Sequence, residues 1–183
     1  MRHKLARIVL WLFVIDLGIA VGAGLYETRI EVPRWTGGGK GFNATAARAA
    51  NTGMRFWIYV TTVPLTALTI ASFVVLRWTD PQTRKWWTIA AYAALGDRVL
   101  TFVYFIPTMI HLMAGLEPNA RAVAFQWSEF NWLRHGMSIA AWLAALQAFA
   151  IFARPRHRHS HPKLAIAGRG AGIEEMELRR MGS

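Results

Sequence analysis

The sequence predicts an all-α integral membrane protein, a four-helix bundle with antiparallel up-down topology and left-handed packing. Three observations predict this fold. Four apolar runs each exceed the roughly 20 residues that cross a bilayer core. Basic residues lie mostly outside these runs, and each run carries polar residues on one helix face. The 183 residues are 54% hydrophobic and include no cysteine, which excludes disulfides and thiolate chemistry.

We expect a membrane domain over residues 1–153 and a basic cytoplasmic tail over residues 154–183. The first apolar run continues past the length of a signal-peptide core without a clear stop, so we expect it to be retained. The expected helices span about 5–26, 54–77, 85–114 and 120–153, and an extracytoplasmic loop spans 28–50.

The net charge of +11 is compatible with nucleic-acid binding, but the position of the charge indicates a membrane protein instead. Basic residues precede the first run, flank the second loop and follow the fourth run. By the positive-inside rule both termini lie in the cytoplasm, although the first loop is also basic. We expect a bacterial inner-membrane protein whose partners are the lipid bilayer and a lipophilic small molecule, with no nucleic acid.

The first expected helix carries acidic residues on one face. Asp16, Ala20, Ala23 and Glu27 follow one another at spacings of four, three and four residues, so they share one side of an α-helix. A carboxylate at membrane depth is costly unless it faces protein or a wet cavity. We therefore expect this face to point into the bundle.

The second expected helix carries mainly hydroxyl groups on one face. Its members are Arg55, Tyr59, Thr62, Thr66 and Thr69. Threonines also pack membrane helices together, so packing is an open alternative for them. Arg55 and Tyr59 begin this helix, and we expect them to contact a substrate.

The third expected helix has the longest polar stripe, Asp97, Thr101, Tyr104, Thr108 and His111. The Asp97 end lies near the middle of the span. We expect Asp97 to form a structural charge network with Asp16 and Arg98 that fixes the helix register. The His111 end lies in the outer half of the span, where Pro107 should kink the helix.

The fourth expected helix places Trp127, Asn131, Arg134 and Ser138 on one face. The four stripes all have the spacing that faces the interior of a bundle, and each contains an ionisable residue. Together they indicate a common polar interior.

The outer half of this interior contains groups suited to acid–base catalysis and oxyanion stabilisation. The candidate catalytic residues are His111, Arg134, Asn131, Glu27 and Tyr104. Trp127, Arg55, Tyr59 and Thr108 are candidate substrate-binding residues. An interfacial histidine bonded to a backbone carbonyl is the alternative interpretation of His111.

A metal site is only weakly indicated. His111 could share a metal ion with Glu27, Glu129 or His135, but no two of them have ligand spacing on one helix face. Haem binding is weakly indicated for the same reason. We expect no metal and no cofactor.

Two segments carry a family resemblance. One is Tyr104–Phe105–Ile106–Pro107–Thr108, and the other contains Trp127, Asn131 and Arg134 at W-x-x-x-N-x-x-R spacing. With Gly22–Ala23–Gly24–Leu25–Tyr26–Glu27, they resemble the anthrone oxygenase-like family of small four-helix membrane proteins over most of residues 5–152. The resemblance implies oxidation of an anthrone to an anthraquinone by molecular oxygen, without flavin or metal.

In that chemistry the substrate carbanion reacts with oxygen directly. His111 or Glu27 would remove the proton, and Arg134, Asn131 and Tyr104 would stabilise the anion. A fold-level resemblance does not establish a function.

Three functional hypotheses follow. The first is a membrane oxidoreductase acting on a lipophilic aromatic or quinone-like molecule, with a closed cavity between the helices. The second is a small-molecule binding or transport protein, which needs a homo-oligomer and an open polar path. The third is a structural membrane subunit with a dry, fully ion-paired interior.

Overall fold

The computed structural model describes residues 1–37, 41–50 and 54–154. The chain divides into two units, Met1–Ala153 and Arg154–Ser183. Every regular element within the described ranges is helical. Apart from Arg154, the expected basic tail lies outside the described residues.

The first long helix continues well beyond the expected end near Tyr26. It consists of α1 (Arg2–Tyr26), a π-helical segment η1 (Glu27–Glu31) and α2 (Val32–Thr36). Gly37 follows with a φ of 55°, a left-handed conformation that suits glycine at a helix end. The segment expected as a loop over 28–50 therefore begins as helix, and it also contains α3 (Ala44–Ala50).

The second and third long helices are built in the same segmented way. The second consists of α4 (Met54–Phe56), π-helical η4 (Trp57–Thr62), α5 (Val63–Val75) and a 3₁₀ turn η5 (Leu76–Trp78). The third consists of α6 (Pro81–Leu100), π-helical η6 (Thr101–Phe105) and α7 (Ile106–Ala114). Asp80 caps α6 by accepting a hydrogen bond from the Thr83 amide, as N-cap aspartates do.

The fourth long helix, α8 (Ala120–Phe152), is α-helical throughout its 33 residues. Within the described residues, four helices are long and apolar enough to cross a membrane: Arg2–Thr36, Trp57–Trp78, Pro81–Ala114 and Ala120–Phe152. The prediction of an all-α chain with four membrane-length helices is confirmed.

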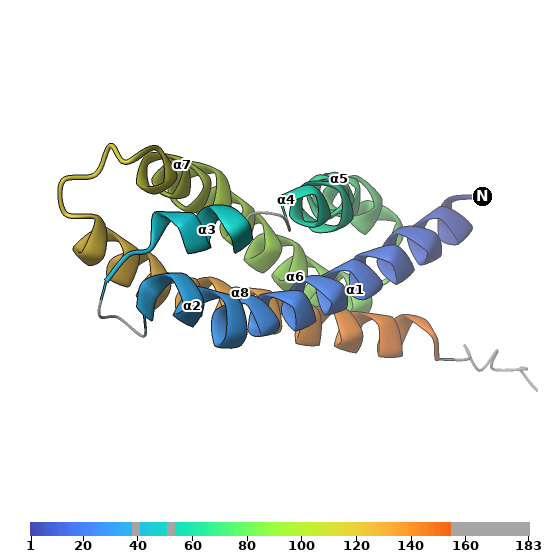
Figure 1. Cartoon of the computed structure of the whole chain (residues 1–183). Helices are drawn as coiled ribbons and strands as arrows, with labels where there is room; N and C mark the ends of the chain where they lie inside the picture. The colour runs from blue at the N-terminus through green and yellow to red at the C-terminus, as the bar shows by residue number, and fades with distance from the viewer. Residues whose placement is uncertain (38–40, 51–53, 155–183) are drawn as a thin grey trace, which may run out of the picture. The chain divides into compact units, whose positions relative to one another are not determined.

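The fourth helix packs against the first and third long helices. Its main contacts are with α6 and α1, while the second helix packs through α5 against α1 and α6 (Figure 1). Residue numbers rise along the first helix while those of their partners on α8 fall. Trp11 contacts Phe149 near the start of the first helix, and Trp35 contacts Trp127 near its end.

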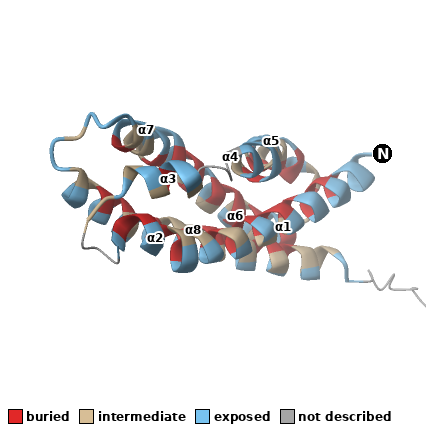
Figure 2. Ribbon diagram, in the orientation of Figure 1, coloured by how far each residue is buried: buried red, intermediate tan, exposed pale blue. Residues whose placement is uncertain are grey.

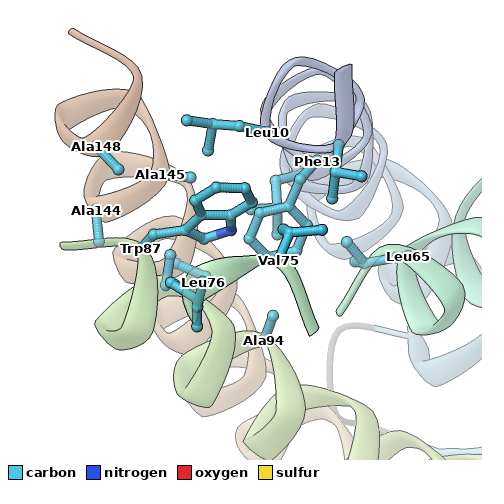
Figure 3. Packing of buried hydrophobic residues seen from close by; sticks show 14 of the residues in the cluster. Leu10, Phe13, Leu65, Val75, Leu76, Trp87, Ala94, Ala144, Ala145 and Ala148 are labelled. Carbon is cyan, nitrogen blue, oxygen red and sulfur yellow. The ribbon is translucent and has the colours of Figure 1, made fainter. Parts of the chain in front are cut away.

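Two apolar clusters hold the helices together, and buried residues lie on the helix faces turned toward neighbouring helices (Figure 2). In the larger cluster, the fully buried indole of Trp87 lies among Leu10, Phe13 and Ala145 (Figure 3). The smaller cluster contains Val32, Trp35, Ala47, Phe105, Leu112, Ala124 and Trp127. On both the first helix and α8, polar residues lie in the stretch between the two clusters.

We predict that replacing Ala145 with leucine lowers the stability of the protein. Ala145 is fully buried in the larger cluster, and overpacking a core costs about 1–3 kcal/mol. Thermal unfolding in detergent should show a lower Tm for Ala145→Leu. The control is Ala150→Leu at an exposed position of the same helix, which should leave the Tm unchanged; equal effects of both variants would contradict the packing described here.

Candidate functional site

Three of the four long helices widen into a π-helical turn, and in each case a proline follows at a fixed distance. Pro33, Pro64 and Pro107 lie two residues after the ends of η1, η4 and η6. The residue directly before each proline donates its amide to the carbonyl five residues earlier. These bonds join Val32 to Glu27, Val63 to Ile58 and Ile106 to Thr101.

The physical cause is the proline ring. Proline has no amide proton, and its ring collides with the carbonyl four residues earlier in an α-helix. A wider turn relieves this collision and keeps the preceding amide bonded. Threonine hydroxyls satisfy nearby carbonyls, since Thr61 donates to the Trp57 carbonyl and Thr101 to that of Asp97, both at 2.8 Å. Such local adjustments make proline tolerable in membrane helices.

A cavity of about 890 Å³ lies beside all three π-helical segments. Its size is within the range of small-molecule sites. Its polar lining comes from Tyr26, Glu27, Glu31, Arg34, Thr61, Thr62, Asp97, Arg98, Thr101, Arg134, His135 and Ser138. Aromatic and aliphatic side chains, together with alanines of α1 and α3, form the rest of the wall.

An ion pair crosses the wall of this cavity. Arg134 Nη2 of α8 lies 3.4 Å from Glu27 Oε2 of η1, and the Arg134 guanidinium also lies over the Phe105 ring, 4.8 Å from its centre. Both charged side chains are mostly buried. Glu27 and Arg134, both candidate catalytic residues from the sequence, are therefore brought together in the structure.

Directly beside this pair, three buried polar side chains form a hydrogen-bonded group. Thr28 Oγ1 accepts a hydrogen bond from Asn131 Nδ2 at 2.9 Å and lies 2.6 Å from His135 Nε2. His135 lines the cavity, whereas Asn131 is fully buried behind the wall. Residues 27 and 28 of the first helix thus bind residues 134 and 135 of α8.

A second charged group forms another part of the wall. Arg98 donates to Asp97 Oδ2, with its Nε at 3.0 Å, and Ser138 donates to Asp97 Oδ1 at 3.2 Å. Asp97, Arg98 and Ser138 all line the cavity. Among the described residues Asp16 takes part in no ion pair, and its Oδ2 atom is buried without a hydrogen-bond partner. The pair expected to be purely structural therefore faces the same space as Arg134.

Aromatic side chains form a neighbouring part of the wall, which contacts Arg134 through Phe105. Trp127 packs edge-on against Trp35 and Phe105, with ring centres 5.3 Å apart in each pair, and its indole Nε1 donates to the Phe105 carbonyl at 3.3 Å. Arg48 of α3 donates twice to the Met113 carbonyl at the end of α7. These contacts hold α3 beside the cavity, where its alanines line the wall.

The π-helical turn η6 changes which residues of the third helix face inward. Each extra residue in a turn rotates the following positions around the helix. Asp97 and Thr101 line the cavity as expected, but from the end of η6 onward the lining positions are Phe105, Ile106, Met109, Ile110 and Met113, and Leu112 is buried. The inward face is therefore shifted by one or two residues from the expected positions 104, 108 and 111.

This shift corrects three sequence-based expectations. His111 is absent from the cavity wall; its side chain is 56% exposed and its Nδ1 lies 3.6 Å from Glu117 Oε1. Tyr104 packs edge-on against Phe105 and Phe130 instead of lining the cavity. Thr108 also lies outside the lining.

A similar correction applies to the second helix. Arg55 and Tyr59 are exposed, and Tyr59 retains 72% of its accessible surface. The positions that line the cavity there are Phe56, Trp57, Ile58, Thr61 and Thr62, so Thr62 of the expected stripe faces the cavity. Expecting an uninterrupted 3.6-residue repeat misplaced Arg55 and Tyr59.

The stripe on α8 lies where the sequence predicts it, because this helix contains no proline and no π-helical turn. Trp127, Arg134 and Ser138 line the cavity, and Asn131 lies buried beside them. Sequence reasoning missed Thr28 and gave His135 only a role as a metal ligand. Pro33, Pro64 and Pro107 are the residues of the sequence that could have indicated the π-helical turns, and therefore the rotated helix faces.

Among the described residues, no three His, Asp or Glu side chains lie close enough together to hold a metal ion. Comparisons of this chain with protein-family models, curated proteins and solved structures give no match. The resemblance to the anthrone oxygenase-like family therefore remains a sequence-based prediction.

We predict that cysteine reactivity will reveal the shifted register after η6. The chain has no cysteine of its own, so a single introduced thiol gives an unambiguous signal. His111→Cys should react rapidly with a water-soluble maleimide in detergent, because position 111 is exposed, whereas Leu112→Cys should be protected at a position that is 1% exposed. The reverse order of reactivity would indicate an uninterrupted α-helical register.

Proposed function

We propose that this chain is a membrane-embedded oxidoreductase that binds a lipophilic aromatic or quinone-like molecule in the cavity described above. The observation that carries the proposal is the Glu27–Arg134 ion pair in the wall of an otherwise largely apolar cavity. Isolated charges at membrane depth are costly, so a mostly buried ion pair beside an open space points to a functional site.

The lining supports a ligand with an apolar ring system and a polar edge. The aromatic part of the wall, with Trp127, Trp35 and Phe105, suits a flat ring. The charged part of the wall, with Arg134 and Arg98, suits an oxygen that becomes negative during reaction.

The ion pair supports proton abstraction from such a ligand. Glu27 would accept the proton, and Arg134 would stabilise the negative charge that develops on the ligand oxygen. The summed charge of Glu27, Arg134 and the ligand is zero before and after this transfer. The transfer therefore leaves no uncompensated charge at membrane depth, where such a charge is costly. Since His111 lies outside the cavity, Glu27 is the better candidate for the base.

Molecular oxygen would then complete the oxidation. In the reaction that the family resemblance implies, a ring methylene beside the conjugated carbonyl system loses two hydrogens and gains one oxygen. The second oxygen atom of O₂ leaves as water. Carbanions of this kind react with oxygen directly, so the protein's task is to remove the proton and hold the anion.

We also propose the membrane arrangement that this function needs: an antiparallel up-down bundle with left-handed packing in a bacterial inner membrane, with both termini cytoplasmic. The α1–α8 contacts support the antiparallel order, because rising residue numbers in the first helix meet falling numbers in α8. The cavity supports this proposal over a purely structural subunit, for which we expected a dry, fully paired interior.

We predict that Arg134→Ala strongly lowers turnover while the protein stays folded. Anthrone is the probe substrate, and oxygen consumption together with anthraquinone absorbance is the measurement in detergent. Losing the main anion-stabilising group should lower kcat by about 10²–10³-fold, and Glu27→Gln should lower it by about 10²–10⁴-fold.

The matched control is Arg77→Ala, which removes an exposed arginine that is not part of the cavity wall. It should leave turnover unchanged. Wild-type activity that survives in Arg134→Ala would overturn the assigned role of Arg134.

We further predict that a larger apolar side chain in the cavity wall weakens ligand binding, even though every charged residue is kept. Ala50 of α3 lines the cavity, and an overpacked site costs about 1–3 kcal/mol. Ala50→Trp should therefore bind anthrone about tenfold more weakly, as measured by quenching of tryptophan fluorescence. Ala114→Trp, at an exposed position outside the lining, is the control; equal affinities in the two variants would place the ligand elsewhere.

A further inference from the structure

We propose that His135 is a neutral hydrogen-bond donor to the ligand, presenting its Nδ1–H to the cavity, and that Thr28 and Asn131 hold it in this tautomer. The proposal rests on the function proposed above and adds a second donor beside Arg134. His135 is 3% exposed and lines the cavity, so its ring is fixed by protein contacts on the sides that do not face the ligand space.

The position of the His135 ring depends on a glycine. A Cβ atom at Gly24 would overlap the imidazole, with Cε1 as the nearest atom, and Nδ1 would be closer to it than Nε2. The ring edge therefore lies directly against the α1 backbone. Any larger residue at position 24 would displace the ring, which gives Gly24 a specific role.

The two ring nitrogens have different surroundings. Nε2 lies 2.6 Å from Thr28 Oγ1, and Thr28 is one helical turn beyond Gly24. Nδ1 is the ring nitrogen nearer to Gly24 of α1, it is not among the fully buried polar atoms that lack a partner, and His135 lines the cavity together with Ala20 and Ala23 of α1. No described residue forms a hydrogen bond with Nδ1.

The proposed tautomer follows from the direction assigned to the Thr28–His135 hydrogen bond. A hydroxyl group has one proton to donate and two lone pairs that accept. Asn131 Nδ2 donates to Thr28 Oγ1 at 2.9 Å, and in the proposed arrangement the hydroxyl donates its own proton to His135 Nε2. A neutral imidazole whose Nε2 accepts must carry its proton on Nδ1.

This arrangement suits the developing anion of the proposed reaction. Preorganised donors aimed at a charge that forms in the transition state lower its energy, and two donors act better than one. Arg134 would supply the charged donor and His135 a neutral one from the next position of α8. A neutral histidine adds no second positive charge next to Arg134.

The test is the tautomer of His135 in the full-length protein labelled with ¹⁵N-histidine in detergent micelles. Two-bond ¹H–¹⁵N correlation spectra distinguish the two neutral tautomers from the imidazolium. We expect the Nδ1–H pattern, assigned because His135→Gln removes it. His111→Gln, the matched control at the exposed histidine, should leave it in place.

Thr28 variants test the cause. Thr28→Ser keeps the hydroxyl and should preserve the Nδ1–H pattern, whereas Thr28→Val removes it and should shift the ring toward the other tautomer. An Nε2–H or imidazolium pattern in the wild type would overturn the proposal. An unchanged pattern in folded Thr28→Val would overturn the role given to Thr28.

Ligand contact is tested with anthraquinone, a carbonyl acceptor, as the probe. Saturable binding should move the His135 Nδ1 signal and leave that of His111 unchanged. A stationary His135 signal during saturable quenching of tryptophan fluorescence would overturn the contact. Absence of any saturable binding would instead contradict the proposed function, and the tautomer pattern would still decide whether His135 is held as described.

Discussion

Three prolines within membrane-length helices determine where this chain places its polar side chains. Pro33, Pro64 and Pro107 each lack an amide proton and collide with a carbonyl one turn earlier. Each collision is relieved by a π-helical turn, in which the preceding amide reaches five residues back. In a membrane this solution keeps backbone groups paired where no water can replace the lost bond.

The polar interior follows from these widened turns. All three contribute to the wall of the cavity, and α8, which has no such turn, supplies Arg134, His135 and Ser138 from a regular helix. The two apolar clusters fix the helices on either side. The charged groups beside the cavity therefore lie between two packed apolar clusters. Single π-helical turns within α-helices are frequent at functional sites.

Much of the fold could be predicted from the sequence, because length and apolarity alone identify four membrane-length helices. The stripe on α8 also lies where its spacing predicts. The stripes on the second and third helices were misplaced because the 3.6-residue repeat holds only while each turn is α-helical. Tyr59 and His111 are exposed for that reason. The Thr28–His135 contact joins residues 107 positions apart, and no local pattern reveals such a pair.

The most direct test of this account is the backbone hydrogen-bond pattern of residues 97–109, resolved in a crystal structure grown from a lipidic phase. We expect the Ile106 amide to bond to the Thr101 carbonyl, and Asp97, Thr101, Phe105 and Met109 to share one wall of the cavity. A continuous α-helix, with Tyr104 and Thr108 on that wall, would contradict the account.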